Sequence, residues 1–189
     1  MLVRYFFINA QNTKLIQLQD GRFLFNWRRN EGTEIAYPKF EAVFQEFVLQ
    51  WKTFLALANE SEVEISQTQF ELTYMDHILL SDFDGKSWAL PKIFSFFAKN
   101  PLGPNIDDAN FSISLPVEDL SGHLHLAGHG GIRNSDRKPV VILETTVRGN
   151  TSKIAHDIES WFDKAHRTIY GAFMDSITPD AKAIWGFSE

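Results

Sequence analysis

Cysteine is absent from the 189 residues, and basic residues are in short supply. The missing thiols exclude a disulfide framework, thiolate metal ligands and a cysteine nucleophile. Lys and Arg number 18 against 24 Asp and Glu, which gives a formal net charge of −6. Because nonspecific binding to nucleic acid needs a basic surface, this acidic balance argues against a nucleic-acid partner.

Long hydrophobic runs are also missing, and no apolar stretch reaches membrane-spanning length. The first residues, MLVRYFFIN, enter a strand-like pattern at once and lack the layout of a signal peptide. We therefore expect a cytoplasmic protein without membrane association. A hydrophobic fraction of 44% is typical of a globular chain, and the length suits one domain spanning residues 1–189.

The stretch KLIQLQDGRFLFNWRR, residues 14–29, predicts a hairpin around Asp20-Gly21 with a positive φ at Gly21. An earlier run over residues 3–8 adds a third strand through the turn AQNT. Since side chains alternate between the faces of a strand, one face becomes an apolar core face and the other a mixed polar face. The core face comprises Val3, Tyr5, Phe7, Ile16, Leu18, Phe23, Phe25 and Trp27.

A helix is predicted after Pro38, with an aromatic stripe at helical spacing that should pack on the core face. We expect Phe25, Trp27, Phe47 and Trp51 to meet there. A second series of strands ends in a helix from near Thr151 to Met174. The expected fold is α+β, with an antiparallel sheet built from two related halves, strands then a long helix in each, and both long helices on one face. The halves cover about 1–60 and 66–176, and a short helix follows at 178–186.

Several segments resemble an uncharacterised, sporadically distributed bacterial protein family. They are LIQLQDGRFLFNWRR, YPKFEAVFQEFVLQW, ELTYMDHI, ETTVRG and AHRTIYGAFMDSITPDAKAIWG. Members of that family carry a further N-terminal segment of strand and helix, which this chain lacks. The resemblance supports the fold and implies no catalytic residue or cofactor.

The motif GHLHLAGHGG offers the most chemistry. In a regular strand His123, His125 and His129 would lie on one face, with Glu144 and Arg148 beside them on the next strand. His and carboxylate ligands could form a metal site, so a metal-dependent enzyme is one reading. The other reading is an exposed histidine cluster, and the neighbouring glycines could introduce a bulge that breaks the shared face.

The polar sheet face is the main candidate binding surface. The alternative is an ordinary solvated sheet face. Apolar side chains among the polar ones favour a partner instead. The candidate residues are Arg4, Gln17, Gln19, Arg22, Asn26, Arg28, His123, His125, Glu144 and Arg148.

We accordingly expect a non-catalytic binding protein that recognises a protein partner or forms a homodimer, with no cofactor and no bound metal. An antitoxin, immunity or defence-associated role would suit a sporadic bacterial distribution. The alternatives are a small-ligand-binding module, which predicts a closed apolar cavity of a few hundred Å³ between sheet and helices, and the metal-dependent enzyme. The strand near Leu2 to Ile8 is apolar on both faces, so we expect its edge to be covered by a second copy, a partner strand or part of this chain's own second half.

Overall fold

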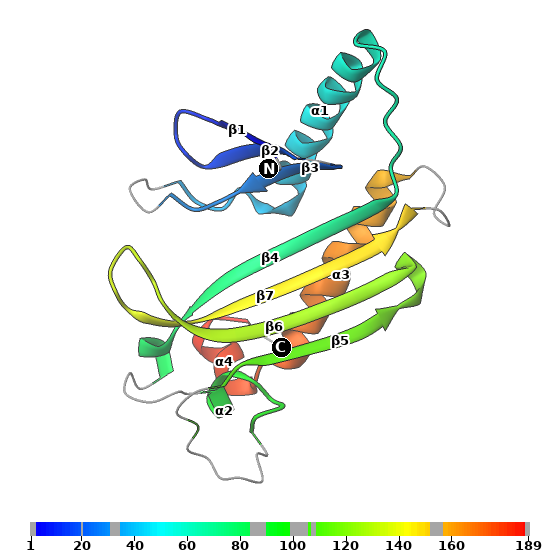
Figure 1. The fold of residues 1–189 in the computed structure, drawn as a ribbon. Coiled ribbons are helices and arrows are strands. Elements are labelled where there is room, and N and C mark those ends of the chain that lie inside the picture. The colour runs from blue at the N-terminus through cyan, green and yellow to red at the C-terminus, as the bar shows by residue number, and fades with distance from the viewer. Residues whose placement is uncertain are drawn as a thin grey trace. The chain divides into compact units, whose positions relative to one another are not determined.

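The computed structural model describes residues 3–19, 21–30, 35–83, 90–98, 106, 109–151 and 157–187. The chain divides into two compact units, Met1–Ser66 and Gln67–Glu189. The first unit combines an antiparallel sheet with one described helix and the second combines one with several, so the expected α+β class is confirmed (Figure 1). The sheets are separate, with three strands in the first unit and four in the second.

The first unit contains the predicted meander of strands β1 (Arg4–Ile8), β2 (Lys14–Gln19) and β3 (Arg22–Trp27) in that order. Tyr5 lies opposite Leu18, and Leu18 lies opposite Phe23. Gly21 has a φ of +67°, a value that favours glycine because it lacks a Cβ. The hairpin register and the positive φ are therefore confirmed.

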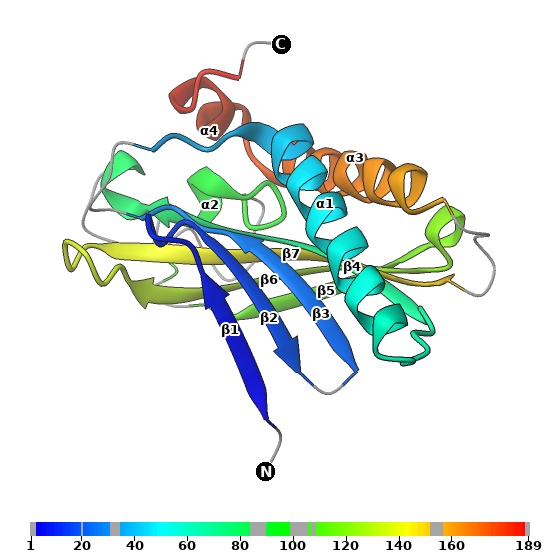
Figure 2. The ribbon, with the colours of Figure 1, turned by 90° about the horizontal axis from the view of Figure 1, so that it is seen from above.

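Helix α1 (Lys39–Glu60) packs on the core face of this meander. Figure 2 shows it running beside β3. Phe23 is the centre of the contact, with ring centroids 6.1 Å from Phe47, 5.2 Å from Trp51 and 5.2 Å from Phe54. The expectation that Trp27 sits in this cluster is wrong. Its ring lies 5.0 Å from that of Tyr37, in the segment that leads into the helix.

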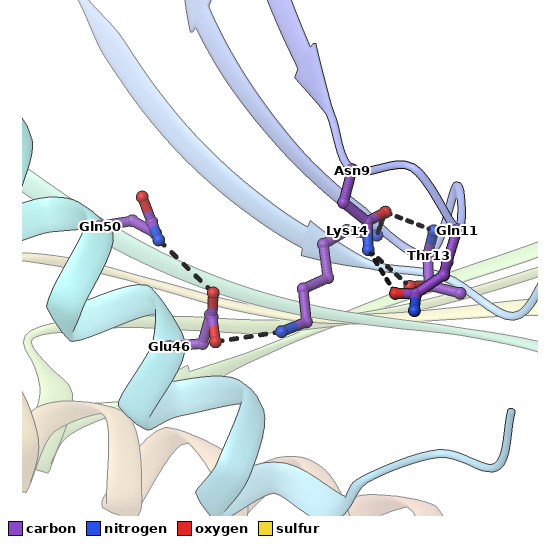
Figure 3. A network of polar contacts seen from close by, with 6 residues as sticks. All are labelled: Asn9, Gln11, Thr13, Lys14, Glu46 and Gln50. Atoms are coloured by element: carbon purple, nitrogen blue, oxygen red, sulfur yellow. Dashed lines mark hydrogen bonds and ion pairs between the residues drawn. The ribbon is translucent and has the colours of Figure 1, made fainter.

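Polar contacts fix the β1–β2 turn and tie the sheet to α1 (Figure 3). The Asn9 side chain accepts hydrogen bonds from the backbone N–H groups of Thr13 and Lys14 at 2.8 and 2.9 Å. The Lys14 ammonium lies 3.0 Å from the Glu46 carboxylate on α1, and the Gln50 amide donates to the same carboxylate at 3.4 Å. The turn geometry and the helix position are thus coupled through one lysine.

The second unit has a four-stranded sheet of order β4-β7-β6-β5. Its strands are β4 (Gln69–Leu79), β5 (Phe111–Val117), β6 (Gly122–Ile132) and β7 (Pro139–Asn150). Helix α3 (Ile158–Ser176) covers one face, and the short helices α2 (Leu90–Ile93) and α4 (Pro179–Ile184) pack near one end. Two 3₁₀ turns, η1 (Leu80–Phe83) and η2 (Glu118–Leu120), follow β4 and β5. Helix α3 begins later than predicted, at Ile158, where the Asp157 side chain accepts from the Ser160 N–H at 3.0 Å.

Part of the core of the second unit lies between the sheet and α3, and a further cluster joins the sheet to η1, α2 and α4. Trp161 is fully buried, and its ring centroid lies 5.4 Å from that of Phe70 on β4. Gly149 on β7 lets the chain pass close by, because a Cβ there would lie 2.2 Å from the backbone oxygen of Leu120 and 3.1 Å from Trp161 Nε1. A side chain at this position is therefore excluded.

Candidate binding surfaces

The candidate residues from the sequence lie on two separate sheets rather than on one sheet. The sheet of the first unit carries Arg4, Gln17, Gln19, Arg22 and Asn26, with Arg28 just after its last strand. The sheet of the second unit carries His123, His125, Glu144 and Arg148. The expectation of a single sheet that carries all of them is therefore wrong, and each unit has its own set of candidate residues.

On the first sheet the polar groups gather at the end near the β2–β3 turn. Arg4 lies opposite Gln19, which lies opposite Arg22. The Gln17 amide donates to the Gln19 side-chain oxygen at 2.8 Å, which holds these two side chains side by side.

Arg28 has a structural contact at the other end of the same sheet. Its Nε donates to the backbone oxygen of Asn12 at 3.2 Å, and its guanidinium also bonds the Asn12 side chain. The arginine thus braces the β1–β2 turn, which accounts for its presence without a ligand.

Strand β1 is the most unusual feature of the first unit. It lies at the sheet edge, and Val3, Tyr5, Phe6, Phe7 and Ile8 keep 53–59% of their surface exposed. Apolar side chains this exposed on both faces of an edge strand are uncommon in soluble proteins. The expected cover for this edge is therefore not supplied by the unit that contains it.

The backbone of β1 shows which groups are free to pair. The Asn9 N–H donates to the Lys14 oxygen at 3.1 Å, so the backbone of Asn9 points toward β2. Successive residues of a strand point their N–H and C=O groups to opposite sides. Arg4, Phe6 and Ile8 therefore turn these groups to the free edge.

On the second sheet the three histidines share the face opposite α3, as predicted. Strand β6 pairs with β7 without interruption from Gly122 to Ile132, so the glycines introduce no bulge. The ring centroids of His123 and His125 lie 6.1 Å apart. His123 lies opposite Arg148, and His125 lies opposite Thr146.

Acidic groups on this face are engaged elsewhere. The Arg148 guanidinium lies 2.5 Å from the Glu71 carboxylate on β4. Glu144 lies opposite Ala127 rather than a histidine, and its carboxylate accepts from Thr146 at 3.4 Å. Across the residues that the structure describes, no group of three His, Asp or Glu side chains is placed to hold a metal ion. The metal-dependent reading therefore lacks a ligand set in this part of the chain.

A cleft of about 250 Å³ lies at the free edge of β4, and the sequence patterns did not indicate it. It is open to solvent, unlike the closed apolar cavity that a small-ligand module predicts. Its lining combines aromatic rings with carboxylates: Asp76, His77, Ile78, Leu79, Asp82, Phe173, Trp185 and Phe187.

The strand pattern of β4 places Asp76 on the side of the sheet that faces α3. Phe70 and Tyr74 share its parity, and their rings contact Trp161 and His166 of α3. Desolvation by the surrounding protein raises the pKa of the Asp76 carboxyl, and the neighbouring His77 opposes this rise. The signal that could have revealed the site was an aspartate with the same strand parity as the helix-side residues of FELTYMDHIL.

Comparisons with family models, curated proteins and solved structures give no match. Among the described residues, none of the helices has the length and apolar character needed to cross a membrane. The function must therefore be argued from the surfaces themselves.

Proposed function

We propose that this chain is a non-catalytic binding protein that recognises a protein partner through the exposed edge strand β1. The observation that supports it is the combination of an apolar strand, exposure on both faces and a free backbone edge. Addition of a partner strand to such an edge satisfies the backbone groups and covers the side chains at once.

A second copy of the chain is the simplest partner. With a twofold axis at Phe6, Phe6 pairs with itself and Arg4 pairs with Ile8 of the other copy, so no two arginines face each other. About six backbone hydrogen bonds would form between the outward groups of Arg4, Phe6 and Ile8. The five exposed apolar residues offer on the order of 500 Å² per copy, close to the roughly 1,000 Å² total expected of a specific interface.

The proposal also includes two related halves and a cytoplasmic role in binding a partner protein. The order of strands and then a long helix in both units supports two related halves. The resemblance to a sporadically distributed bacterial family supports a cytoplasmic antitoxin, immunity or defence-associated partner protein. In each case the protein acts by binding.

Sedimentation velocity at micromolar concentration, together with the Phe6→Lys variant, tests the proposal. A lysine at the centre of the edge faces its own copy across the twofold, so we expect self-association to weaken by about 100-fold. Leu57→Lys is the matched control, because Leu57 is equally exposed on α1 but lies away from the edge. Affinity purification with the same variants tests whether the edge of β1 binds a different protein instead of a second copy.

A monomer whose captured proteins are the same for wild type and Phe6→Lys would contradict the proposal. Loss of self-association in both variants would also contradict it, because the interface would then not lie on β1. Loss in Phe6→Lys alone supports strand addition.

A further inference from the structure

The β4-edge cleft has the chemistry of a site for an organic cation. Three aromatic side chains line it, and two of their ring pairs are in contact: Phe173 and Trp185 are stacked at 6.0 Å, and Phe173 and Phe187 meet edge-on at 6.2 Å. Its two carboxylates belong to Asp76 and Asp82, and its lining includes no Lys or Arg among the described residues. Ring faces attract cations through their quadrupole, and an adjacent carboxylate adds direct attraction.

Asp76 is the acidic group in the cleft that is most available to a ligand, because the residue is exposed to solvent. Its carboxylate has no hydrogen bond or ion pair with the residues that the structure describes, and it interacts electrostatically with the neighbouring His77. Partial loss of hydration raises the pKa of this carboxyl, yet the exposed side chain stays within reach of a ligand in the cleft. A cation bound in the cleft would pair with this accessible carboxylate.

The strand edge adds hydrogen-bonding groups to the same cleft. The Thr151 N–H donates to the Thr68 oxygen at 3.1 Å, so the backbone of Thr68 points toward β7. Because backbone direction alternates along a strand, His77 and Leu79 turn their N–H and C=O groups to the free edge. This explains why both residues line the cleft although their side chains have the opposite parity to Asp76.

We infer that the cleft binds an alkylammonium group, with Asp76 as its counter-ion and Trp185 and Phe173 as its aromatic wall. The volume of about 250 Å³ suits a headgroup of choline size or the end of a lysine side chain. The net charge of −6 favours the approach of a cation over a long range. This site is independent of the β1 proposal, since all its lining residues belong to the second unit.

Titration of the full chain with choline, followed by the indole N–H resonance of Trp185, tests the inference. The neutral isostere 3,3-dimethyl-1-butanol has the same shape without the charge and should bind at least about tenfold more weakly. Asp76→Asn keeps the side-chain size, and we expect it to weaken choline binding by about tenfold. Asp175→Asn is the matched control, because Asp175 is exposed on α3 and does not line the cleft.

A second binding measurement, with a peptide, identifies the source of the ammonium group. An extended lysine-containing peptide that binds more tightly than choline assigns the site to a lysine side chain presented along the β4 edge, and the reverse order assigns it to a free cation. Two results would overturn the inference: equal binding of choline and its neutral isostere, or unchanged choline binding in Asp76→Asn. Proton resonances of the variant that match wild type outside the cleft show that its fold is intact.

Discussion

Some single side chains in this protein lower the stability of the folded state. Asp76 is the clearest case, because a carboxylate stands on the helix side of a sheet next to aromatic rings. Its pKa is raised in the folded state, so folding is favoured when the group is protonated. The contribution of the protonated Asp76 carboxyl to stability is fully present at a pH below the pKa that the group has in the unfolded chain. It is lost as the pH rises through the pKa that the group has in the folded protein.

Asp76→Asn should therefore raise the free energy of unfolding at pH 7. The gain should disappear near pH 3, where the carboxyl of wild type is protonated in both states. Urea melts at the two pH values measure it, with Asp175→Asn as the control. A variant that is less stable than wild type at pH 7 would mean that the carboxylate has a stabilising partner.

Replacing two glycines by alanine should change the free energy of unfolding in opposite directions. Gly149→Ala should lower the free energy of unfolding by at least about 2 kcal/mol, because the new Cβ would overlap the Leu120 backbone. A methyl group added at Gly171, on α3, would meet no neighbouring atom within 4 Å, so Gly171→Ala should raise it by about 0.5–1 kcal/mol through helix propensity. Thermal melts distinguish the two, and equal effects would contradict the close approach at Gly149.

At the scale of helices and strands, the side chains that come into contact depend on the angle at which a helix packs on its sheet. Parity and the Asp-Gly turn were enough to predict the register of β1, β2 and β3, because a one-residue slip would move every apolar side chain to the wrong face. They could not predict that Phe23 rather than Trp27 meets Phe47. That contact depends on where α1 begins and on how Tyr37 leads into it.

In the candidate sites, too, features set by strand parity were predictable from the sequence, whereas contacts between distant segments were not. The shared face of His123, His125 and His129 followed from strand parity and was predictable. The cleft at Asp76 brings together β4, α3 and residues after α4, which are distant in the sequence. No local sequence pattern predicts that these segments come together, so only the strand parity of Asp76 could have pointed to the cleft.

The packing of α1 can be measured through its aromatic contacts. Phe47 is half-buried, so Phe47→Ala should lower the free energy of unfolding by about 2 kcal/mol, less than the roughly 3–5 kcal/mol typical of a fully buried phenylalanine. Leu49→Ala is the control on the exposed side of the same helix, and its effect should stay within about 0.5 kcal/mol. Equal losses in denaturant melts would contradict the assigned orientation of α1.

At the scale of the whole molecule, the two units differ in how much core they contain. Among the described residues of the first unit, the buried apolar ones are Phe40 and Ala58, whereas the second unit has a cluster that includes Leu90, Phe94 and Leu143. Small sheets with little buried surface are marginal on their own. The first unit therefore has the greater need of a partner.

Residues 67–187 expressed alone should fold with the same core, since that cluster is drawn entirely from this part of the chain. A dispersed two-dimensional amide spectrum, with Trp161 protected from solvent exchange, is the expected result. An unfolded fragment would show that the second unit depends on the first.

The strand order β4-β7-β6-β5 also sets a sequence of events in folding. Strands β6 and β7 are neighbours in the chain and can pair early, but β4 must wait for β7, which is made of residues far along the sequence. Contacts of long sequence separation form slowly, because loop closure must precede them. If β4 docks after the rate-limiting step, a ligand held at its edge would slow unfolding and leave the folding rate unchanged.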